Sequence, residues 1–312
     1  MAALMAAALI AGTACSAKKG GESTDEMAAD SLQNTEEATN TSKAYPWDFP
    51  EGIALENPEE GQYVLSPYTF YPKALTKNDP ASETLIFYST TLTKYGDTHS
   101  VVANNVEMPN THSTLDNLGK DPVEMPNSLI ILLPKGEKAH VGDVLLTWWQ
   151  SGSGLQRAIV TDASDPEQPR VMYLDLKYGE NGSANEHANE QLKPSSFDVL
   201  RDGEWQPGAA IAAFDGRKWR EGVLIHATDD RVLMLGFAAS IKAYPRADCR
   251  LIPLNQNLKV GDEVMAIFVG SFTSGYKITR IDRRIGRIWV KDMEHENEQE
   301  EALSILQVVK KL

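Results

Sequence analysis

Beyond residue 50, the chain consists of short apolar segments separated by turns rich in Gly, Pro, Asn and Asp. Some segments alternate apolar and polar residues, and others are continuous apolar runs too short for a buried helix. Alternation of this kind places every second side chain on the same face of a strand. The pattern therefore predicts an all-β protein of short antiparallel strands with hardly any helix.

The apolar segments recur in the same order three times. Each repeat opens on a Gly and an apolar strand, at 141–148, 207–214 and 260–267. Later strands of the three repeats are expected at 157–161, 221–225 and 277–281, then at 170–174, 231–235 and 287–291, and finally at 197–200, 250–253 and 304–308. Such repeats indicate small antiparallel barrels, and glycine at the strand start suits a bend or bulge at a barrel corner.

A fourth, more degenerate repeat precedes these three. Its opening strand is expected at 61–65 and its closing strand at 128–132, with an Asn/Pro/Thr-rich insertion near 104–127. The predicted plan is a first β-barrel unit with an insertion at 51–135, followed by barrels at 136–202, 203–255 and 256–312.

The repeats resemble Tudor and agenet-type domains, which belong to the SH3-like barrel group. The similarity is carried by the pattern Gly-x-x-Val-x-Ala, then Trp-x-x-Gly-x-Val, then Val-x-Leu/Val. Its closest segment is Gly208–Leu235, with Ala212, Trp219, Gly222, Val223 and Val232, and Gly261–Val290 comes next. The resemblance covers residues 140–311 and implies three or four tandem Tudor-like or SH3-like barrels. Short apolar motifs specify a fold better than a function.

In the Tudor family, aromatic side chains form an open cage for a methylated Lys or Arg through cation–π attraction. Candidate ligand-binding aromatics at comparable places here are Trp148, Trp149, Tyr173, Trp219, Phe237, Tyr276 and Trp289. The alternative for each is packing in a core or between barrels. Trp148 and Trp149 point to opposite faces of their strand, so one of them is expected on a surface, either a seam between barrels or a ligand platform.

The first residues resemble a bacterial lipoprotein signal. Residues 1–11 are apolar and are followed by Gly12-Thr13-Ala14-Cys15 and a polar segment. No Lys or Arg precedes the apolar run, and Gly12 stands where that family usually has a Leu-like residue. The resemblance implies a signal peptide at 1–14 and a lipid such as palmitate on the Cys15 thiol, which would anchor the chain to a membrane. The alternative is an ordinary secretory peptide with an incidental Cys15.

A polar segment then leads to the first repeat. Residues 15–50 contain few large apolar side chains, so we expect a disordered acidic tether. The whole chain has 44 acidic and 30 basic residues, a net charge of −14, which makes it a poor ligand for nucleic acid. Much of the acidity lies between residues 16 and 60 and is interpreted as a solvated spacer.

Signatures of metal, cofactor or enzyme chemistry are missing from the sequence. Two cysteines exclude a disulfide-rich scaffold, a four-cysteine zinc site and a thiolate-held iron–sulfur cluster. The six histidines are scattered, and the segment 151–154 (SGSG) is interpreted as a hairpin loop. No cofactor or metal is therefore expected. A hydrolase would use residues in or beside the insertion, with Asp97, His99, His112 and Asp116 as candidates. It would need His99, His112 and one Asp to converge in space.

A basic cluster lies in the last repeat. Its members are Lys277, Arg280, Arg283, Arg284, Arg287 and Lys291. It could bind phosphate, lipid headgroups or nucleic acid, but the acidic stretch 292–301 is expected to neutralise it within the same barrel.

These observations together predict a noncatalytic, lipid-anchored protein of the cell envelope, held on the extracytoplasmic side. Its partner is expected to be an envelope protein or peptide, bound through grooves between tandem barrels. The alternative is a cell-wall or glycan-binding module, in which an exposed Trp148 or Trp149 would stack on sugar; the hydrolase is the third hypothesis.

Overall fold

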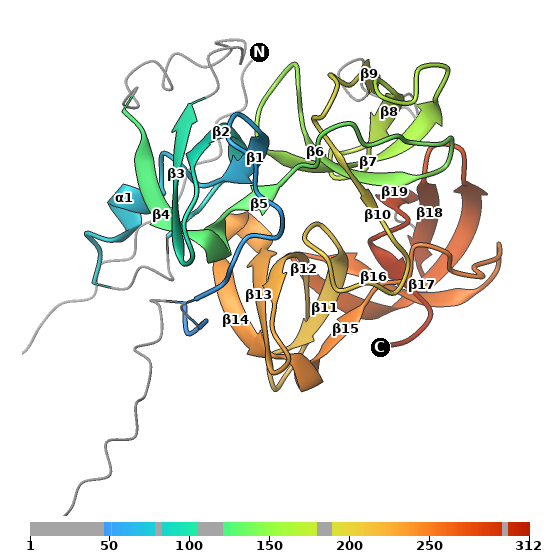
Figure 1. Ribbon diagram of the computed structural model, residues 1–312. Helices are drawn as coiled ribbons and strands as arrows, with labels where there is room; N and C mark the ends of the chain where they lie inside the picture. The colour runs from blue at the N-terminus through green and yellow to red at the C-terminus, as the bar shows by residue number, and fades with distance from the viewer. Residues whose placement is uncertain (1–46, 51, 79–82, 105–120, 180–188, 295–298) are drawn as a thin grey trace, which may run out of the picture. The chain divides into compact units, whose positions relative to one another are not determined.

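Antiparallel strands make up nearly all of the regular structure (Figure 1). The computed structural model describes residues 47–50, 52–78, 83–104, 121–179, 189–294 and 299–312. The prediction of an all-β protein is confirmed for these residues. The predicted signal peptide and Cys15 lie outside them, as does the predicted tether up to residue 46.

The first strand set forms a sheet of order β4-β3-β2-β1-β5. Its strands are β1 (Tyr63–Ser66), β2 (Tyr88–Lys94), β3 (His99–Asn104), β4 (Val123–Pro126) and β5 (Ile131–Leu132). A short helix, α1 (Tyr71–Ala74), follows β1, and a 3-10 turn, η2 (Asn127–Leu129), joins β4 to β5.

The second strand set forms a sheet of order β10-β6-β7-β8-β9. Its strands are β6 (Val144–Trp148), β7 (Leu155–Asp162), β8 (Arg170–Tyr173), β9 (Asn189–Gln191) and β10 (Asp198–Leu200).

The third and fourth strand sets share one ten-stranded sheet, because β12 pairs with β17. The third set comprises β11 (Ala210–Phe214), β12 (Trp219–Ala227), β13 (Arg231–Gly236), β14 (Ile241–Pro245) and β15 (Cys249–Leu251), with the 3-10 turns η4 (Phe237–Ala239) and η5 (Arg246–Asp248). The fourth set comprises β16 (Glu263–Phe268), β17 (Ser271–Asp282), β18 (Arg287–Asp292), β19 (Glu301–Ser304) and β20 (Val308–Val309).

All four strand sets have the same internal order. In each, the first four strands form an antiparallel meander, and the fifth returns to pair with the first. One set lies within each of the four segments expected from the sequence. None of the sheets closes on itself in the described residues.

A glycine before the first strand recurs in every set. The φ angles of Gly61, Gly142, Gly208 and Gly261 lie between +76° and +94°, a region that favours glycine. Each glycine N–H donates to a carbonyl of the second strand, that of Leu92, Val160, Leu224 or Ile278. The pairing of that strand with the third strand shifts register directly after this residue. The expected bulge is therefore confirmed beside this turn, in the second strand of each set.

Most strands are buried on both faces, because the strand sets share a core. In β6, Leu145 packs in the core of the second set, whereas Leu146 joins a larger cluster that draws residues from all four sets. Leu224 and Ile225 of β12 divide in the same way. This explains why the strands read as continuous apolar runs. The described residues accordingly all belong to one compact unit.

The folded part begins before residue 50. Trp47 and Phe49 fall within the predicted tether 15–50, but both are almost fully buried in the shared core. Their large apolar side chains favour that burial.

Candidate functional site

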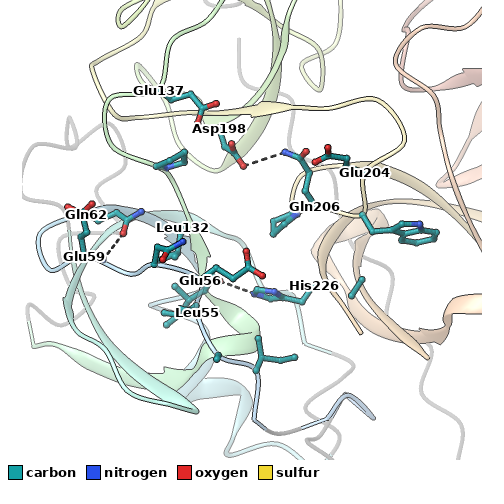
Figure 2. A pocket seen from close by; sticks show the side chains of 18 of the residues that line it. Leu55, Glu56, Glu59, Gln62, Leu132, Glu137, Asp198, Glu204, Gln206 and His226 are labelled. Atoms are coloured by element: carbon teal, nitrogen blue, oxygen red, sulfur yellow. Dashed lines mark hydrogen bonds between the residues drawn. The ribbon is translucent and has the colours of Figure 1, made fainter. Parts of the chain in front are cut away.

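A cavity of about 800 Å³ lies where the first three strand sets meet (Figure 2). Its walls come from segment 52–59 before β1, segment 130–137 around β5, segment 198–207 that begins with β10, and the end of β12. We call it the acidic cavity.

Buried side chains fix the walls of the acidic cavity to the strand sets. The Asn127 amide donates to the Ile53 carbonyl at 2.9 Å and so holds segment 52–59 against the first set. The Gln62 amide donates to the Leu133 carbonyl, also at 2.9 Å, beside the start of the second wall. The cavity shape is therefore built into the packed structure.

Carboxylates dominate the charge of the cavity. Its lining includes the acidic residues Glu56, Glu59, Glu137, Asp198 and Glu204, and the basic residues Lys135 and Arg201. Five carboxylates against two cations leave a formal excess of three negative charges. Apolar side chains such as Leu55 and Leu132 line the space between them (Figure 2).

The basic side chains pair mainly with carboxylates at the rim. Lys135 contacts Glu59 at 2.9 Å, and Arg201 lies 3.6 Å from Glu137 and 3.9 Å from Glu204. All these groups except Glu137 are well exposed, so these pairs are weak.

Asp198 and Glu137 lie on one side of the cavity (Figure 2). Burial, and after it the neighbouring Glu137 charge, raise the pKa of the Asp198 carboxyl to about 7. Burial also raises the pKa of Glu137, and Asp143 adds to that effect, although Arg201 opposes it. Asp198 accepts a long hydrogen bond, 3.5 Å, from the Gln206 amide. Arg201 and a backbone hydrogen bond from Val199 also favour the charged forms of both carboxyls, but they only partly offset the effect of burial, since both pKa values remain raised.

His226 faces Glu56 across the cavity from that pair (Figure 2). Its Nε2–H donates to the Ile130 carbonyl at 2.9 Å, because a carbonyl can only accept. Burial lowers the pKa of His226, so the ring is neutral near pH 7 and adds no positive charge to the wall.

Three of the candidate aromatics lie in cores. Trp148, Tyr173 and Trp289 are almost fully buried. Trp148 packs against Tyr63 of the first set, with ring centroids 5.3 Å apart, so it lies in a seam between strand sets. The Tyr173 hydroxyl lies 3.1 Å from the Trp148 carbonyl and 2.8 Å from the Glu190 carboxylate. Trp149 is half-buried against the core of the second set, so the two tryptophans point to opposite faces, and the surface expected for one of them is the seam that Trp148 occupies.

The other candidate aromatics are spread over the third and fourth sets. Trp219 and Tyr276 are half-buried, whereas Phe237 is exposed. Arg250 lies over the Trp219 ring, and Arg280 lies 3.4 Å from the Trp289 ring centroid, so arginines of the chain itself cover these faces. The structure does not bring the seven aromatics together, and a role in ligand binding stays a prediction for each.

The basic cluster of the last repeat does not form one patch. Arg287 is buried and donates to the carbonyls of Tyr173, Leu174 and Leu176 in the second set. Arg283 donates to the Leu258 carbonyl, and Arg284 pairs with Asp282 at 3.0 Å. Backbone carbonyls and Asp282 are therefore the partners of these three arginines, and residues 295–298 of the acidic stretch 292–301 lie outside the described residues.

The hydrolase hypothesis rests partly on residues that the structure does not describe. Asp97 and His99 flank the start of β3, but His112 and Asp116 lie outside the described residues. Among the described residues, no group of three or more His, Cys, Asp or Glu side chains is arranged to hold a metal ion.

Comparisons with known proteins do not assign the chain to a family. No protein-family profile matches the chain, and no curated protein is significantly similar to it. In the described part of the chain, no helix is long and apolar enough to cross a membrane.

The sequence did not indicate the acidic cavity. The acidic run 16–60 predicts a solvated spacer, yet its members Glu56 and Glu59 line the cavity. Asp198 follows an apolar residue at the start of a closing strand and carries no local motif. The only available signal was the excess of acidic residues itself.

Proposed function

We propose that this chain is a noncatalytic binding protein whose acidic cavity takes a cationic segment of a protein or peptide partner. The observation that carries the proposal is the uncompensated excess of carboxylates around a preformed cavity with apolar walls. A Lys or Arg side chain matches both features, because its charged group pairs with carboxylates while its methylene stem covers apolar surface.

The lining suits binding better than nucleophilic catalysis. Among the described residues that line the cavity, none is Ser, Thr or Cys, and the Nε2 of His226 is already engaged with a backbone carbonyl. The raised pKa values of Asp198 and Glu137 fit a cation-binding site, because a bound cation would stabilise the charged carboxylates that burial disfavours.

The proposal also assigns the four strand sets as tandem Tudor-like or SH3-like barrels. Four sets with one strand order, and the same glycine turn before each first strand, support that assignment. The acidic cavity would then be a groove between barrels, as the sequence predicts for a peptide partner.

Envelope localisation and lipid anchoring at Cys15 are part of the same proposal. They are supported by the apolar run 1–11 and the small residues before Cys15. Radiolabelled palmitate that enters the parent chain but not Cys15→Ser would support the anchor. A parent chain that remains unlabelled in a lipoprotein-processing host would contradict it.

Peptide binding tests the cavity directly. We expect a labelled octapeptide of alternating Lys and Ala to bind the full chain more tightly than its Gln/Ala counterpart, as measured by fluorescence anisotropy. The double variant Glu137→Gln/Asp198→Asn should weaken binding by about tenfold, because it removes two of the five carboxylates that line the cavity. Glu263→Gln, an exposed acidic residue of β16, is the control that should leave binding unchanged.

Two outcomes would contradict the proposal. One is equal binding of the Lys and Gln peptides, and the other is an equal loss in the cavity variant and in Glu263→Gln. Binding of soluble wall fragments that the Lys peptide does not displace would instead favour the glycan-binding alternative.

A further inference from the structure

Three large apolar side chains are exposed where the turn between β16 and β17 meets η4. Phe237, Phe268 and Val269 are 61%, 62% and 63% exposed, respectively. The lining of the acidic cavity does not include them. Such high exposure of three neighbouring apolar residues is unusual on a soluble surface and marks an interaction site. We call them the apolar tip.

The three residues belong to one cluster. Phe237 packs against the backbone of Gly270, since a Cβ atom at position 270 would lie 2.4 Å from the Phe237 Cβ. Gly270 follows Phe268 and Val269 in the turn, and Phe268 pairs with Ser271 across it. The tip therefore joins the third strand set to the fourth, beside the pairing of β12 with β17.

The loop that carries Phe237 is fixed by the first strand set. Ala238 and Ala239 both have φ +56°, which is uncommon for residues other than glycine. Their carbonyls accept hydrogen bonds from the Thr84 hydroxyl at 3.3 Å and from the Leu85 N–H at 2.8 Å. The loop is thus held in a costly conformation that presents Phe237 to solvent.

The turn that carries Val269 is also strained. Val269 and Gly270 have φ +46° and +67°, and two positive values at the centre of a two-residue hairpin define a type I′ turn. That turn favours Asn-Gly, whereas a β-branched residue at positive φ is an outlier. Strain of this kind persists mainly at functional sites. The strained, exposed Val269 therefore points to a function of this turn rather than to a contribution to stability.

Basic residues flank the apolar tip. The three segments that meet there, 214–221, 236–242 and 267–273, contain four basic residues and two acidic residues, Asp215 and Glu221. The Glu221 backbone N–H donates to the Gly270 carbonyl at 3.1 Å, and its half-buried carboxylate lies 3.7 Å from Arg157. The basic residues are Arg217, Lys218, Arg220 and Lys242, and Asp215 is already held by Arg220 at 2.6 Å. On a chain of net charge −14, this is a locally cationic surface.

We propose that the apolar tip is a membrane-contact site that inserts into the headgroup region of an anionic bilayer. Protruding Phe and Val side chains match the boundary between headgroups and acyl chains, and the flanking cations match the lipid phosphates. The site is independent of the acidic cavity and of any lipid on Cys15. It would hold the third and fourth strand sets against the membrane surface.

Vesicle flotation tests this proposal. The full chain carrying Cys15→Ser, which cannot be acylated there, should float with vesicles of phosphatidylglycerol and phosphatidylethanolamine but not with pure phosphatidylcholine. The added change Phe237→Ser/Phe268→Ser should reduce the bound fraction by about tenfold. The matched control Val141→Ser/Val260→Ser alters two valines that are 67% and 64% exposed elsewhere, and it should bind like the parent.

A second variant separates membrane contact from folding. Val269→Asn relieves the turn and removes an apolar side chain, so it should raise thermal stability and yet lower vesicle binding. The proposal is overturned if the parent does not bind anionic vesicles, or if the tip variants bind as well as the control. It is also overturned if the tip variants lose only a self-association seen by sedimentation equilibrium, because the tip would then be an interface between copies.

Discussion

Asp198 stands partly buried in the wall of the acidic cavity, and burial together with the Glu137 charge raises the pKa of its carboxyl to about 7. Below that pH the group is neutral, and above it the group is charged. Since the pKa of Glu137 is also raised, both groups gain negative charge in the same direction as pH increases. Affinity for a cation should therefore change within the physiological range.

Binding of the Lys/Ala peptide should strengthen by about fivefold between pH 6 and pH 8, because a second nearby carboxylate becomes ionised. Anisotropy titrations at constant ionic strength measure this change. The variant Asp198→Asn should flatten most of the dependence. An affinity that falls over the same interval would count against a cationic ligand.

Ionisation of Asp198 should have the opposite effect on stability: it should strengthen cation binding but destabilise the fold. A raised pKa means that the charged carboxyl disfavours the folded state above its unfolded pKa, with the full cost present above pH 7. Asp198→Asn should therefore increase the free energy of unfolding by about 2 kcal/mol at pH 8 and by less at pH 5.

Asp262 is the contrasting control for that measurement. Its pKa is lowered by a hydrogen bond from Lys310 and by the Lys259 backbone N–H. Asp262→Asn should reduce stability at pH 8, so the two Asp→Asn changes should have opposite signs in urea denaturation. Equal signs would show that the Asp198 carboxyl is not penalised by burial.

At the scale of elements, the repeated glycine turn is the feature that defines each strand set. Gly208 and Gly261 have nearly equal φ angles, +90° and +92°, but different surroundings. A Cβ atom at position 208 would lie 2.8 Å from the Leu146 Cβ of the second set, whereas nothing lies within 4 Å of one at position 261.

This pair separates backbone strain from packing between strand sets. Gly261→Ala should lower the free energy of unfolding by about 1 kcal/mol, because it places a side chain at positive φ. Gly208→Ala should lower the free energy of unfolding by about 3 kcal/mol, since the clash with Leu146 adds to the same backbone strain. Urea unfolding of both variants measures the difference, and equal costs would argue against tight packing of the third set on the second.

These turns and first strands could be predicted from the sequence because their chemistry is local. A turn that needs positive φ requires glycine, and an apolar run after it indicates a buried strand. β9 (Asn189–Gln191) escaped prediction because its residues are polar and pair through backbone hydrogen bonds. The alternation rule predicted that Trp148 and Trp149 point to opposite faces of their strand. It could not predict which of the two would pack against the first strand set.

At the scale of the whole molecule, buried arginines join strand sets that are distant in sequence. Arg287 of the fourth set supplies three hydrogen bonds to carbonyls of the second set, the shortest 2.6 Å long. Arg157 of the second set pairs with Asp175 at 2.6 Å and reaches Glu221 of the third set at 3.7 Å. Such pairings connect residues that no local pattern relates, so the shared core and the acidic cavity could not be predicted.

Arg287 should therefore matter far more than its neighbours in the basic cluster. Arg287→Met should lower the free energy of unfolding by about 3 kcal/mol, because buried carbonyls lose their donors. Arg284 is 88% exposed and pairs with Asp282, so Arg284→Met should change it by less than about 0.5 kcal/mol. Similar losses for the two variants, measured by urea unfolding, would contradict the bridging role of Arg287.

The central claim is that the acidic cavity binds a cationic segment, and zero-length carbodiimide cross-linking tests it most directly. The reagent joins a peptide amine to a carboxylate that it contacts, and mass spectrometry identifies the carboxylate. With the Lys/Ala peptide on the full chain, cross-links should concentrate on Glu56, Glu59, Glu137, Asp198 and Glu204 and should decrease when unlabelled peptide competes. Cross-links spread over acidic residues in proportion to their exposure would contradict the claim.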